Sequence, residues 1–367
     1  MRSLYVQHLG GDWEVLAGFA RINWGVTESR KLVDVINQTD FVEDIGTDDK
    51  LGQPMLALTL LRDVGTLDLF VMPYQRARTF PGPKGQTRIG FDFAPEEARY
   101  ESSRRQRRVD VAGRFRMRFG ALDLNLSAFD GTARDPDILP CLRRGSNFEG
   151  TQEQANCDLL SAVPPPERPL PDLVFNLLQG LGLLPDDETL MAQFIAEQTP
   201  RVLANLVLVP DYARLQQLGL ETQYITGGWA LKLEAVARKR GATNSHAAVA
   251  GFEYALPRFF DTGWEVSALA EYLYDQRRTL INSRSDNDLF VASRISLNDI
   301  AGTEFLAGFF MDHSGNDHLM QVEASRRFGQ HWRGRLTARH FERVPGEPFI
   351  NFLKDESMVS FQLERFF

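Results

Sequence analysis

The feature that most constrains this chain is an alternation of apolar and polar residues that recurs from one end to the other. Successive side chains of a β-strand point to opposite faces, whereas an α-helix repeats every 3.6 residues. The pattern therefore predicts strands that have one apolar and one polar face. A clear example is the stretch 109–119, where the apolar face carries Val109, Val111, Phe115, Met117 and Phe119 and the polar face carries Asp110, Arg114, Arg116 and Arg118.

We expect fifteen such strands. Their approximate ranges are 2–8, 12–23, 55–62, 66–77, 107–118, 121–129, 213–225, 229–239, 245–257, 263–275, 287–297, 302–312, 317–328, 331–341 and 357–367. Many of them are about 11 residues long, whereas the strands of globular proteins usually have about five or six. A strand that crosses a membrane within a barrel needs about 9–11 residues, of which only every second one must be apolar.

The connections between the expected strands differ in length. Short ones contain the Gly and Asp residues that suit tight hairpins, at 10–12, 63–65, 226–228, 261–263 and 329–330. The other connections are long, at about 24–54, 78–106, 130–212, 276–286 and 342–356. Short turns at one end and long loops at the other are typical of outer-membrane barrels. A β-sandwich, whose strands also alternate, is the competing prediction.

Aromatic residues gather at the ends of the expected strands, where a barrel carries its interfacial girdles. They are Trp13, Trp24, Trp229, Trp264, Trp332, Phe119, Phe129 and Phe367. Together with strand length they favour an all-β fold, an antiparallel transmembrane β-barrel of about 15–16 visible strands, over the sandwich. We therefore expect residues 1–367 to form a single outer-membrane barrel.

Composition and the two chain ends add further expectations. The formal net charge of −8 argues against nucleic acid as a partner. No stretch approaches 18 consecutive apolar residues, so no transmembrane helix is predicted, and the first residues lack the apolar core of a signal peptide. If the C-terminus is periplasmic, counting strands backwards places Met1 outside the cell. We therefore expect a signal peptide and at least one strand before Met1, and a seam between 2–8 and 357–367.

Two of the long connections have a pattern of their own. Residues 25–54 contain apolar residues at roughly helical spacing after Thr27, a capping-type residue. They are Leu32, Val33, Val35 and Ile36. This segment is predicted to fold into the lumen as a constriction loop, with an extracellular cap as the alternative. Residues 130–212 are predicted to be a large extracellular insertion with two short helices, at about 172–180 and 187–198.

The polar faces of the strands would line the lumen, and their charges would tune which solutes pass. The candidates are Arg108, Asp110, Arg114, Arg116, Arg118, Lys232, Glu234, Glu323, Arg327, Arg333, Arg335 and Arg339. Arginine exceeds acid in this set, which favours anionic or carboxylate-bearing solutes. The alternative is that the charges pair across neighbouring strands and fill a narrow interior.

Other chemistry has weaker support. Cys141 and Cys157 could form a disulfide or be unrelated thiols, because spacing alone does not fix geometry. The six histidines have no metal-ligand spacing, and no cofactor motif is present. The acidic stretches 47–50 and 285–288 could hold a divalent cation, although solvated turns are commoner. No enzymatic activity is predicted, because only the adjacent Asp312, His313 and Ser314 offer a nucleophile, a base and a carboxylate together.

Five segments carry a resemblance to a known family. They are FARINWGVTESRKLVDVINQTD (19–40), LDLFVMPYQRARTFPG (67–82), FDGTARDPDILP (129–140), AEYLYD (270–275) and the ending Leu363–Phe367. They resemble a family of uncharacterised porin-like outer-membrane proteins of Gram-negative bacteria. The similarity covers most of the chain, apart from an insertion near 141–210 and the missing front. It implies a barrel in the outer membrane, and it implies neither a substrate nor a catalytic residue.

These observations favour a porin-like channel for passive or substrate-selective uptake or export of small solutes. Its expected partners are outer-membrane lipids, an unknown small solute and other transport components of the envelope. The alternatives are a plugged structural or lipid-handling barrel of the envelope and an outer-membrane hydrolase. Conductance in planar bilayers would separate the channel from the plugged barrel, and lipid or peptide hydrolysis would identify the enzyme.

Overall fold

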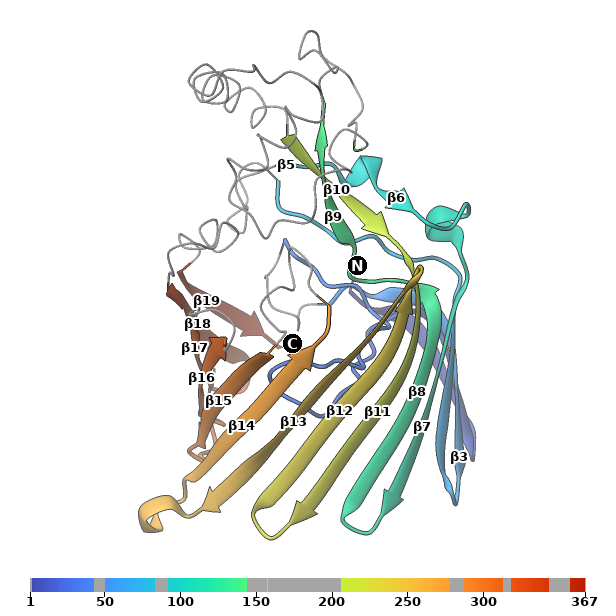
Figure 1. The fold of residues 1–367 in the computed structure, drawn as a ribbon. Coiled ribbons are helices and arrows are strands. Elements are labelled where there is room, and N and C mark those ends of the chain that lie inside the picture. The colour runs from blue at the N-terminus through green and yellow to red at the C-terminus, as the bar shows by residue number, and fades with distance from the viewer. Residues whose placement is uncertain are drawn as a thin grey trace, which may run out of the picture.

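A computed structural model describes residues 2–42, 50–82, 92–143, 157, 206–277, 287–312, 318–342 and 357–366. The chain is an all-β protein whose main element is one antiparallel sheet of 15 strands. The sheet curves around an interior, and an N-terminal segment runs through this interior (Figure 1). Within the described part of the chain, no helix has the length and apolar character needed to span a bilayer.

The strands follow one another around the sheet in chain order, as consecutive antiparallel neighbours. Their bounds are β1 Leu4–Leu9, β2 Trp13–Ala20, β3 Gln53–Arg62, β4 Gly65–Met72, β7 Asp110–Phe119, β8 Leu122–Thr132, β11 Arg214–Thr226, β12 Trp229–Arg240, β13 Thr243–Pro257, β14 Glu265–Asp275, β15 Asn287–Ser296, β16 Glu304–Asp312, β17 His318–Phe328, β18 Trp332–Glu342 and β19 Met358–Arg365. Each of the fifteen predicted strands is confirmed, and the barrel-type antiparallel fold is the one that the alternation predicts.

The two edges of the sheet are β1 and β19. Within the described residues no pairing register joins these two strands, which are the ones between which we expected a seam. All six residues of β1 are exposed, Val6 at 77%. On β19, Val359 is 72% exposed. A further strand before Met1 stays a prediction.

The turns at one end of the sheet are tight. Gly120 and Gly227 adopt positive φ angles of 61° and 57° in the β7–β8 and β11–β12 turns, a conformation that glycine takes at no steric cost. These turns lie at the lower end in Figure 1, opposite the long connections. One departure from the expected pattern lies at the long-loop end, where Gly241 and Ala242 alone connect β12 to β13.

A second, smaller sheet lies in the long connections and was not predicted. It pairs β10 (Leu206–Tyr212) with β9 (Asp137–Leu142), β5 (Asp92–Phe93) and β6 (Arg99–Tyr100). Cys141 and Cys157 form a disulfide beside Val207 and Val209. Two one-turn 3-10 helices, η1 (Pro95–Glu97) and η2 (Arg105–Arg107), belong to the same region, and a third, η3 (Phe259–Asp261), follows β13. The two helices expected at 172–180 and 187–198 lie outside the described residues.

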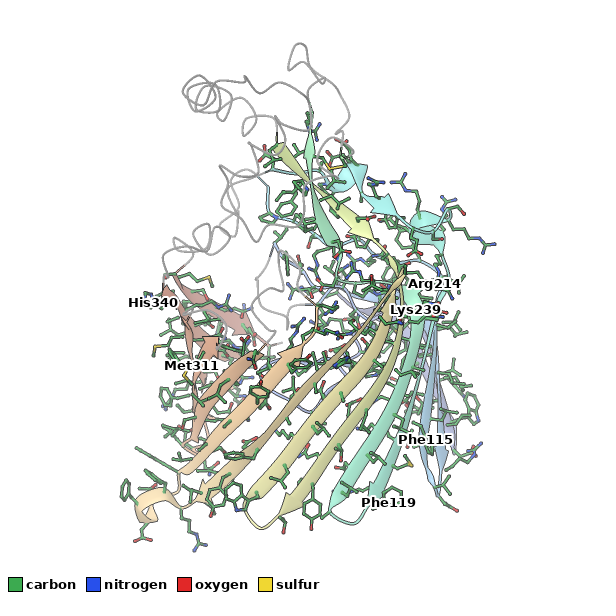
Figure 2. The ribbon with its side chains drawn as sticks, in the orientation of Figure 1. Phe115, Phe119, Arg214, Lys239, Met311 and His340 are labelled. Carbon is green, nitrogen blue, oxygen red and sulfur yellow. A yellow bond between two sulfur atoms is a disulfide. The ribbon has the colours of Figure 1, made fainter. Side chains whose placement is uncertain are left out.

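The outward face of the sheet is apolar and exposed. Leu218 on β11 and Leu126 on β8 are 66% and 48% exposed. At the tight-turn end five aromatic residues are also exposed, namely Trp13, Phe119, Trp229, Trp264 and Trp332. Figure 2 shows Phe119 at that end and Arg214 and Lys239 at the opposite end.

Two of the predicted girdle residues lie elsewhere. Trp24 is buried in the segment that runs through the interior, with its ring 5.8 Å from that of Phe70. Phe129 is buried on the inward face of β8, where Arg134 lies over its ring at 5.3 Å. Both rings serve the packing of the interior, because their positions fall on the inward face or on the internal loop. Phe367 lies outside the described residues.

Candidate functional site

The interior of the barrel is occupied on one side by residues 21–40, which we call the lumen loop. Its apolar residues pack into one core with inward-facing residues of the sheet. From the loop this core contains Trp24, Leu32, Val33, Val35 and Ile36, and from the sheet it contains residues of β2, β3, β4, β7, β8 and β11–β15. On these strands the lumen face is therefore the face that contacts this loop.

Three buried carboxylates on the lumen face hold the loop by its backbone amides. Glu234 on β12 accepts hydrogen bonds from the amides of Val26 (2.7 Å), Thr27 (3.0 Å) and Val33 (3.2 Å). Glu221 on β11 accepts one from the amide of Gly25 at 3.0 Å. Charge-assisted bonds of this kind are about twice as strong as neutral ones, so a short segment without regular structure gains a fixed position.

A third carboxylate extends this pattern. Glu271 on β14 accepts from the amides of Glu28 at 3.0 Å and of Ser29 at 2.8 Å, and also from the Ser29 hydroxyl. Along the loop, Gly25 is thus bound by β11, Val26 and Thr27 by β12, and Glu28 and Ser29 by β14. Because unpaired buried amides are costly, the carboxylates replace the partners that a helix or strand would provide.

The local conformation of the loop follows from two residues. Gly25 has a φ of +108°, and a Cβ added there would lie 2.8 Å from Glu234 Oε1, so only glycine fits. The Thr27 hydroxyl has two acceptors within reach of its one proton, Glu234 Oε1 at 2.6 Å and the carbonyl of Arg30 at 2.9 Å. Residues 32–36, whose apolar positions have roughly helical spacing, form turns and bends, and their apolar side chains pack into the core shared with the wall.

The base of the loop is closed by Asn37. Its side-chain oxygen accepts from the Ile22 amide at 2.8 Å, and its Nδ2 donates to the carbonyls of Ala20 and Leu51 at 2.9 Å each. The next residue, Gln38, accepts from Arg78 Nε at 3.1 Å. Asn37 therefore joins the entry and exit of the lumen loop, and Gln38 links its end to Arg78.

Above the loop, a group of buried and half-buried arginines and aspartates lies at the long-loop end. Arg238 donates to the Leu32 carbonyl at 3.0 Å and to Asp275 at 3.3 Å. Asp135, in the connection after β8, pairs with Arg78 at 3.0 Å. Burial raises the pKa of Asp135, but Arg78, Arg277, Arg240 and Arg30 lower it further, so its pKa falls below the usual value.

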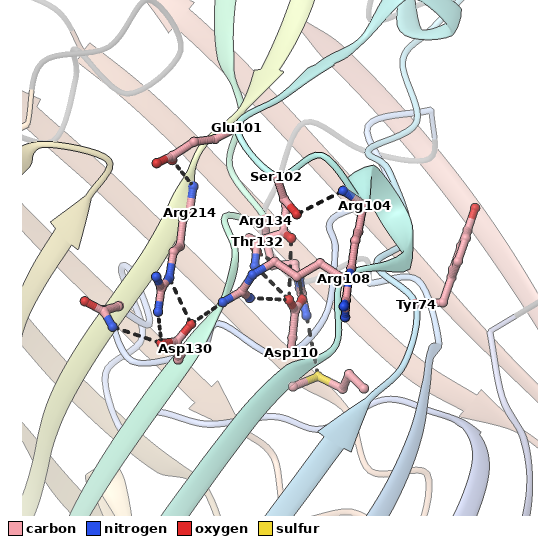
Figure 3. Close-up of polar contacts among 12 residues, drawn as sticks. Tyr74, Glu101, Ser102, Arg104, Arg108, Asp110, Asp130, Thr132, Arg134 and Arg214 are labelled. Atoms are coloured by element: carbon pink, nitrogen blue, oxygen red, sulfur yellow. Dashed lines mark hydrogen bonds and ion pairs between the residues drawn. The ribbon is translucent and has the colours of Figure 1, made fainter.

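A second ionic cluster lies at the rim beside it (Figure 3). Asp110, fully buried, accepts from Arg134 at 2.7 Å, from Arg108 at 2.9 Å and from the Thr132 amide at 2.9 Å. Arg134 also donates to the Ile36 carbonyl at 2.9 Å. The rim cluster thus binds the lumen loop, and it satisfies a buried carboxylate that would otherwise be strongly destabilising.

The predicted lumen residues on or beside β7 and β12 are Arg108, Asp110, Arg114, Arg116, Arg118, Lys232 and Glu234. Among the described residues each has an ionic or hydrogen-bonding partner. Arg114 pairs with Glu221 at 2.6 Å, Arg116 with Asp68 at 2.9 Å, and Lys232 with Glu253 at 3.0 Å. Arg118 is 73% exposed at the tight-turn end, 3.3 Å from Asp123.

The other predicted lumen residues form a row on β17 and β18, away from the lumen loop. They are Glu323, Arg327, Arg333, Arg335 and Arg339. Arg339 donates to Gln321 at 3.1 Å, which in turn donates to Glu323 at 2.6 Å. Arg333 donates to Ser325 at 3.1 Å. Within the described residues no carboxylate forms an ion pair with Arg327, Arg333 or Arg335, so this wall carries excess positive charge.

Sequence reasoning missed several residues that hold the loop. Glu221 and Glu271 lie on the polar face of alternating strands, as Glu234 does, so the alternation that made Glu234 a lumen candidate was also present for them. Asn37 and Gln38 were quoted only as part of a motif. Arg134 and Asp135 follow β8, in a segment without periodicity, and nothing in the pattern assigned them an interior position.

The remaining candidates are the acidic stretches that could hold a cation and the residues Asp312, His313 and Ser314. Among the described residues no group of His, Cys, Asp and Glu could hold a metal ion. Residues 47–49 and 285–286 of the two acidic stretches lie outside the described residues, as do His313 and Ser314. Asp288, which is described, is buried on β15.

No family model and no curated protein matches the chain. Solved structures that match include the carbohydrate-binding β-barrel Wzi, an outer-membrane protein involved in capsule assembly in Escherichia coli, at 10% identity and a TM-score of 0.44, covering 92% of this chain. The chain spans 65% of the length of Wzi.

Two further solved structures also match. OpdK of Pseudomonas aeruginosa, solved with vanillate, has 11% identity and a TM-score of 0.36, covering 90% of this chain and 71% of OpdK. An anion-selective porin from Comamonas acidovorans has 8% identity and a TM-score of 0.36, covering 91% of this chain and 75% of the porin. At this level the likeness concerns the barrel fold alone.

Proposed function

We propose that the protein is a porin-like channel of a Gram-negative outer membrane, with a lumen narrowed by residues 21–40. The observation that carries the proposal is the placement of this loop. It is bound to the inner wall by Glu221, Glu234 and Glu271 along one side of the barrel. A segment fixed in this way narrows the passage and sets its lining.

The outward surface supports a membrane location. Side chains such as Leu218, Leu126 and Val111 are exposed and apolar, while most residues that alternate with them face the lumen and are polar. A surface of this kind exposed to water would be unfavourable by about 25 cal/mol for each Å². A bilayer removes this cost, and the strand lengths of 10 to 15 residues from β11 to β15 match its thickness.

The excess of arginine on β17 and β18 supports a preference for anions. Arg327, Arg333 and Arg335 have no described ionic partner, whereas the charges beneath the lumen loop are largely paired. An arginine held beside a pathway attracts carboxylate or phosphate groups through its planar fork of donors. We therefore infer small anionic or carboxylate-bearing solutes as the preferred cargo.

The experiment is reconstitution of the full-length protein in planar bilayers, with measurement of the zero-current potential across a salt gradient. Wild-type protein should conduct and favour anions. The Arg327→Gln/Arg333→Gln/Arg335→Gln variant should conduct with a weaker anion preference, whereas an Arg62→Gln control at the tight-turn end should match wild type. An unchanged potential in the triple variant would contradict the inferred selectivity.

A second candidate is a plugged barrel, favoured by the extent to which the lumen loop fills one side of the interior. Wild-type protein that inserts in the bilayer but carries no current would support it. Catalysis of lipid or peptide hydrolysis has no comparable support from the residues described.

A further inference from the structure

A separate basic cluster lies on the outside of the molecule at the long-loop end. It consists of Arg104, Arg105 and Arg107, which we call the rim arginines, in and beside the short helix η2. All three are exposed. Among the described residues no carboxylate forms an ion pair with any of them, in contrast to the neighbouring Arg108, which binds Asp110 and Asp130. Figure 3 shows Arg104 beside this paired cluster.

The backbone that presents the rim arginines is held in place. Gln106 accepts a hydrogen bond from the Tyr74 hydroxyl at 2.8 Å, and its carbonyl accepts from the Gln75 amide at 2.8 Å. Arg105 donates to the Ala98 carbonyl at 3.0 Å and lies over the ring of Tyr100 at 5.4 Å. The backbone of the cluster and the Arg105 side chain are therefore preorganised, which lowers the entropic cost of binding a ligand.

The position of the cluster relates it to the outward apolar surface. Arg107 ends η2 two residues before Val109, and Val109 and Val111, just before β7 and on its outward face, are both 46% exposed. Val71 on β4 pairs with Val111 and is 43% exposed. The rim arginines thus lie just beyond the end of a continuous apolar band, which is the level of the headgroups if the band lies in lipid.

We propose that the rim arginines bind phosphate groups of the phosphorylated glycolipid that forms the outer leaflet of a Gram-negative outer membrane. This inference rests on the membrane location in the proposed function. One arginine can donate two parallel hydrogen bonds to two oxygens of a phosphate group. Clusters of basic residues beside a membrane surface also attract anionic headgroups. The adjoining valines would contact the acyl chains of the same lipid, so one lipid molecule would span both surfaces.

The test measures binding of purified glycolipid to the full-length protein in detergent, with its phosphorylated and its enzymatically dephosphorylated forms as probes. The variant is Arg104→Gln/Arg105→Gln/Arg107→Gln. Its matched control is Arg62→Gln/Arg258→Gln/Arg326→Gln, which removes three exposed arginines at the tight-turn end. Each lost rim arginine should weaken binding roughly fivefold, so the triple variant should bind about 100-fold more weakly.

Wild type and control should prefer the phosphorylated glycolipid, and the rim variant should lose this preference. Equal binding of both lipid forms by wild type, or unchanged binding by the rim variant, would overturn the proposal. Conductance in planar bilayers should be the same for all three proteins. A protein that binds the lipid but carries no current would contradict the channel and leave the lipid site supported.

Discussion

Replacement of Glu234 by alanine should release the lumen loop from the wall. The substitution removes the acceptor of the Val26, Thr27 and Val33 amides and of the Thr27 hydroxyl. A buried donor left without a partner costs about 1–3 kcal/mol, and water entering the lumen recovers part of this. At about 1 kcal/mol for each of the three amides the cost is about 3 kcal/mol, which raises the open fraction of the loop about 100-fold.

The assay is thiol labelling of a Val35→Cys variant. The Val35 side chain is 6% exposed in the closed loop, so a cysteine at this position is protected until the loop opens. The chain's only two cysteines are bonded to each other, so the new thiol reports alone. When closing is faster than labelling, the labelling rate follows the open fraction. The rate should therefore rise about 100-fold on addition of Glu234→Ala.

Glu234→Gln is the matched comparison. The amide oxygen of glutamine can still accept from Val26 and Thr27, and only the bond from the Val33 amide is lost. The labelling rate should rise about tenfold, which corresponds to about 1.4 kcal/mol. A rate for Glu234→Ala within about twofold of the parent would refute the reasoning. It would mean that apolar packing alone holds the loop.

Three further predictions concern other parts of the structure. Gly25→Ala should lower the thermal midpoint in detergent, because its Cβ would meet Glu234 at a φ of +108°, whereas Gly11→Ala, which meets nothing, should leave it unchanged. Asp135→Asn should reduce stability to denaturant near neutral pH. The depressed pKa of Asp135 means that its contribution is present above the ordinary value of 3.8 and is lost as pH falls through the folded value, so variant and wild type should converge only in strong acid. Reduction of the Cys141–Cys157 disulfide, 16 residues apart, should cost about 3 kcal/mol of stability. Reductant should leave a Cys141→Ser/Cys157→Ser variant unaffected, and an equal response of both proteins would contradict this.

The sequence contains enough information to place the strands of the main sheet but less about what lies inside it. Alternation is a local signal, and it identified β7 and β12 with their lumen faces because one face is uniformly apolar. The small sheet left no such signal, since β5 and β6 have two residues each and β10 begins with four consecutive apolar residues. The lumen loop is held by contacts more than 190 residues apart in sequence, as between Gly25 and Glu221, and periodicity carries no information on such pairs.

The most direct test of the account is the single-channel conductance of the full-length protein with and without the inner part of the lumen loop. In the variant, residues 26–35 are replaced by a short Gly-Ser linker, which leaves Gly25 and the Asn37 closure in place. Wild type should carry a small current, and the variant should carry a larger one with a weaker dependence on solute size. Equal conductance in both proteins would contradict the claim that residues 21–40 narrow the lumen.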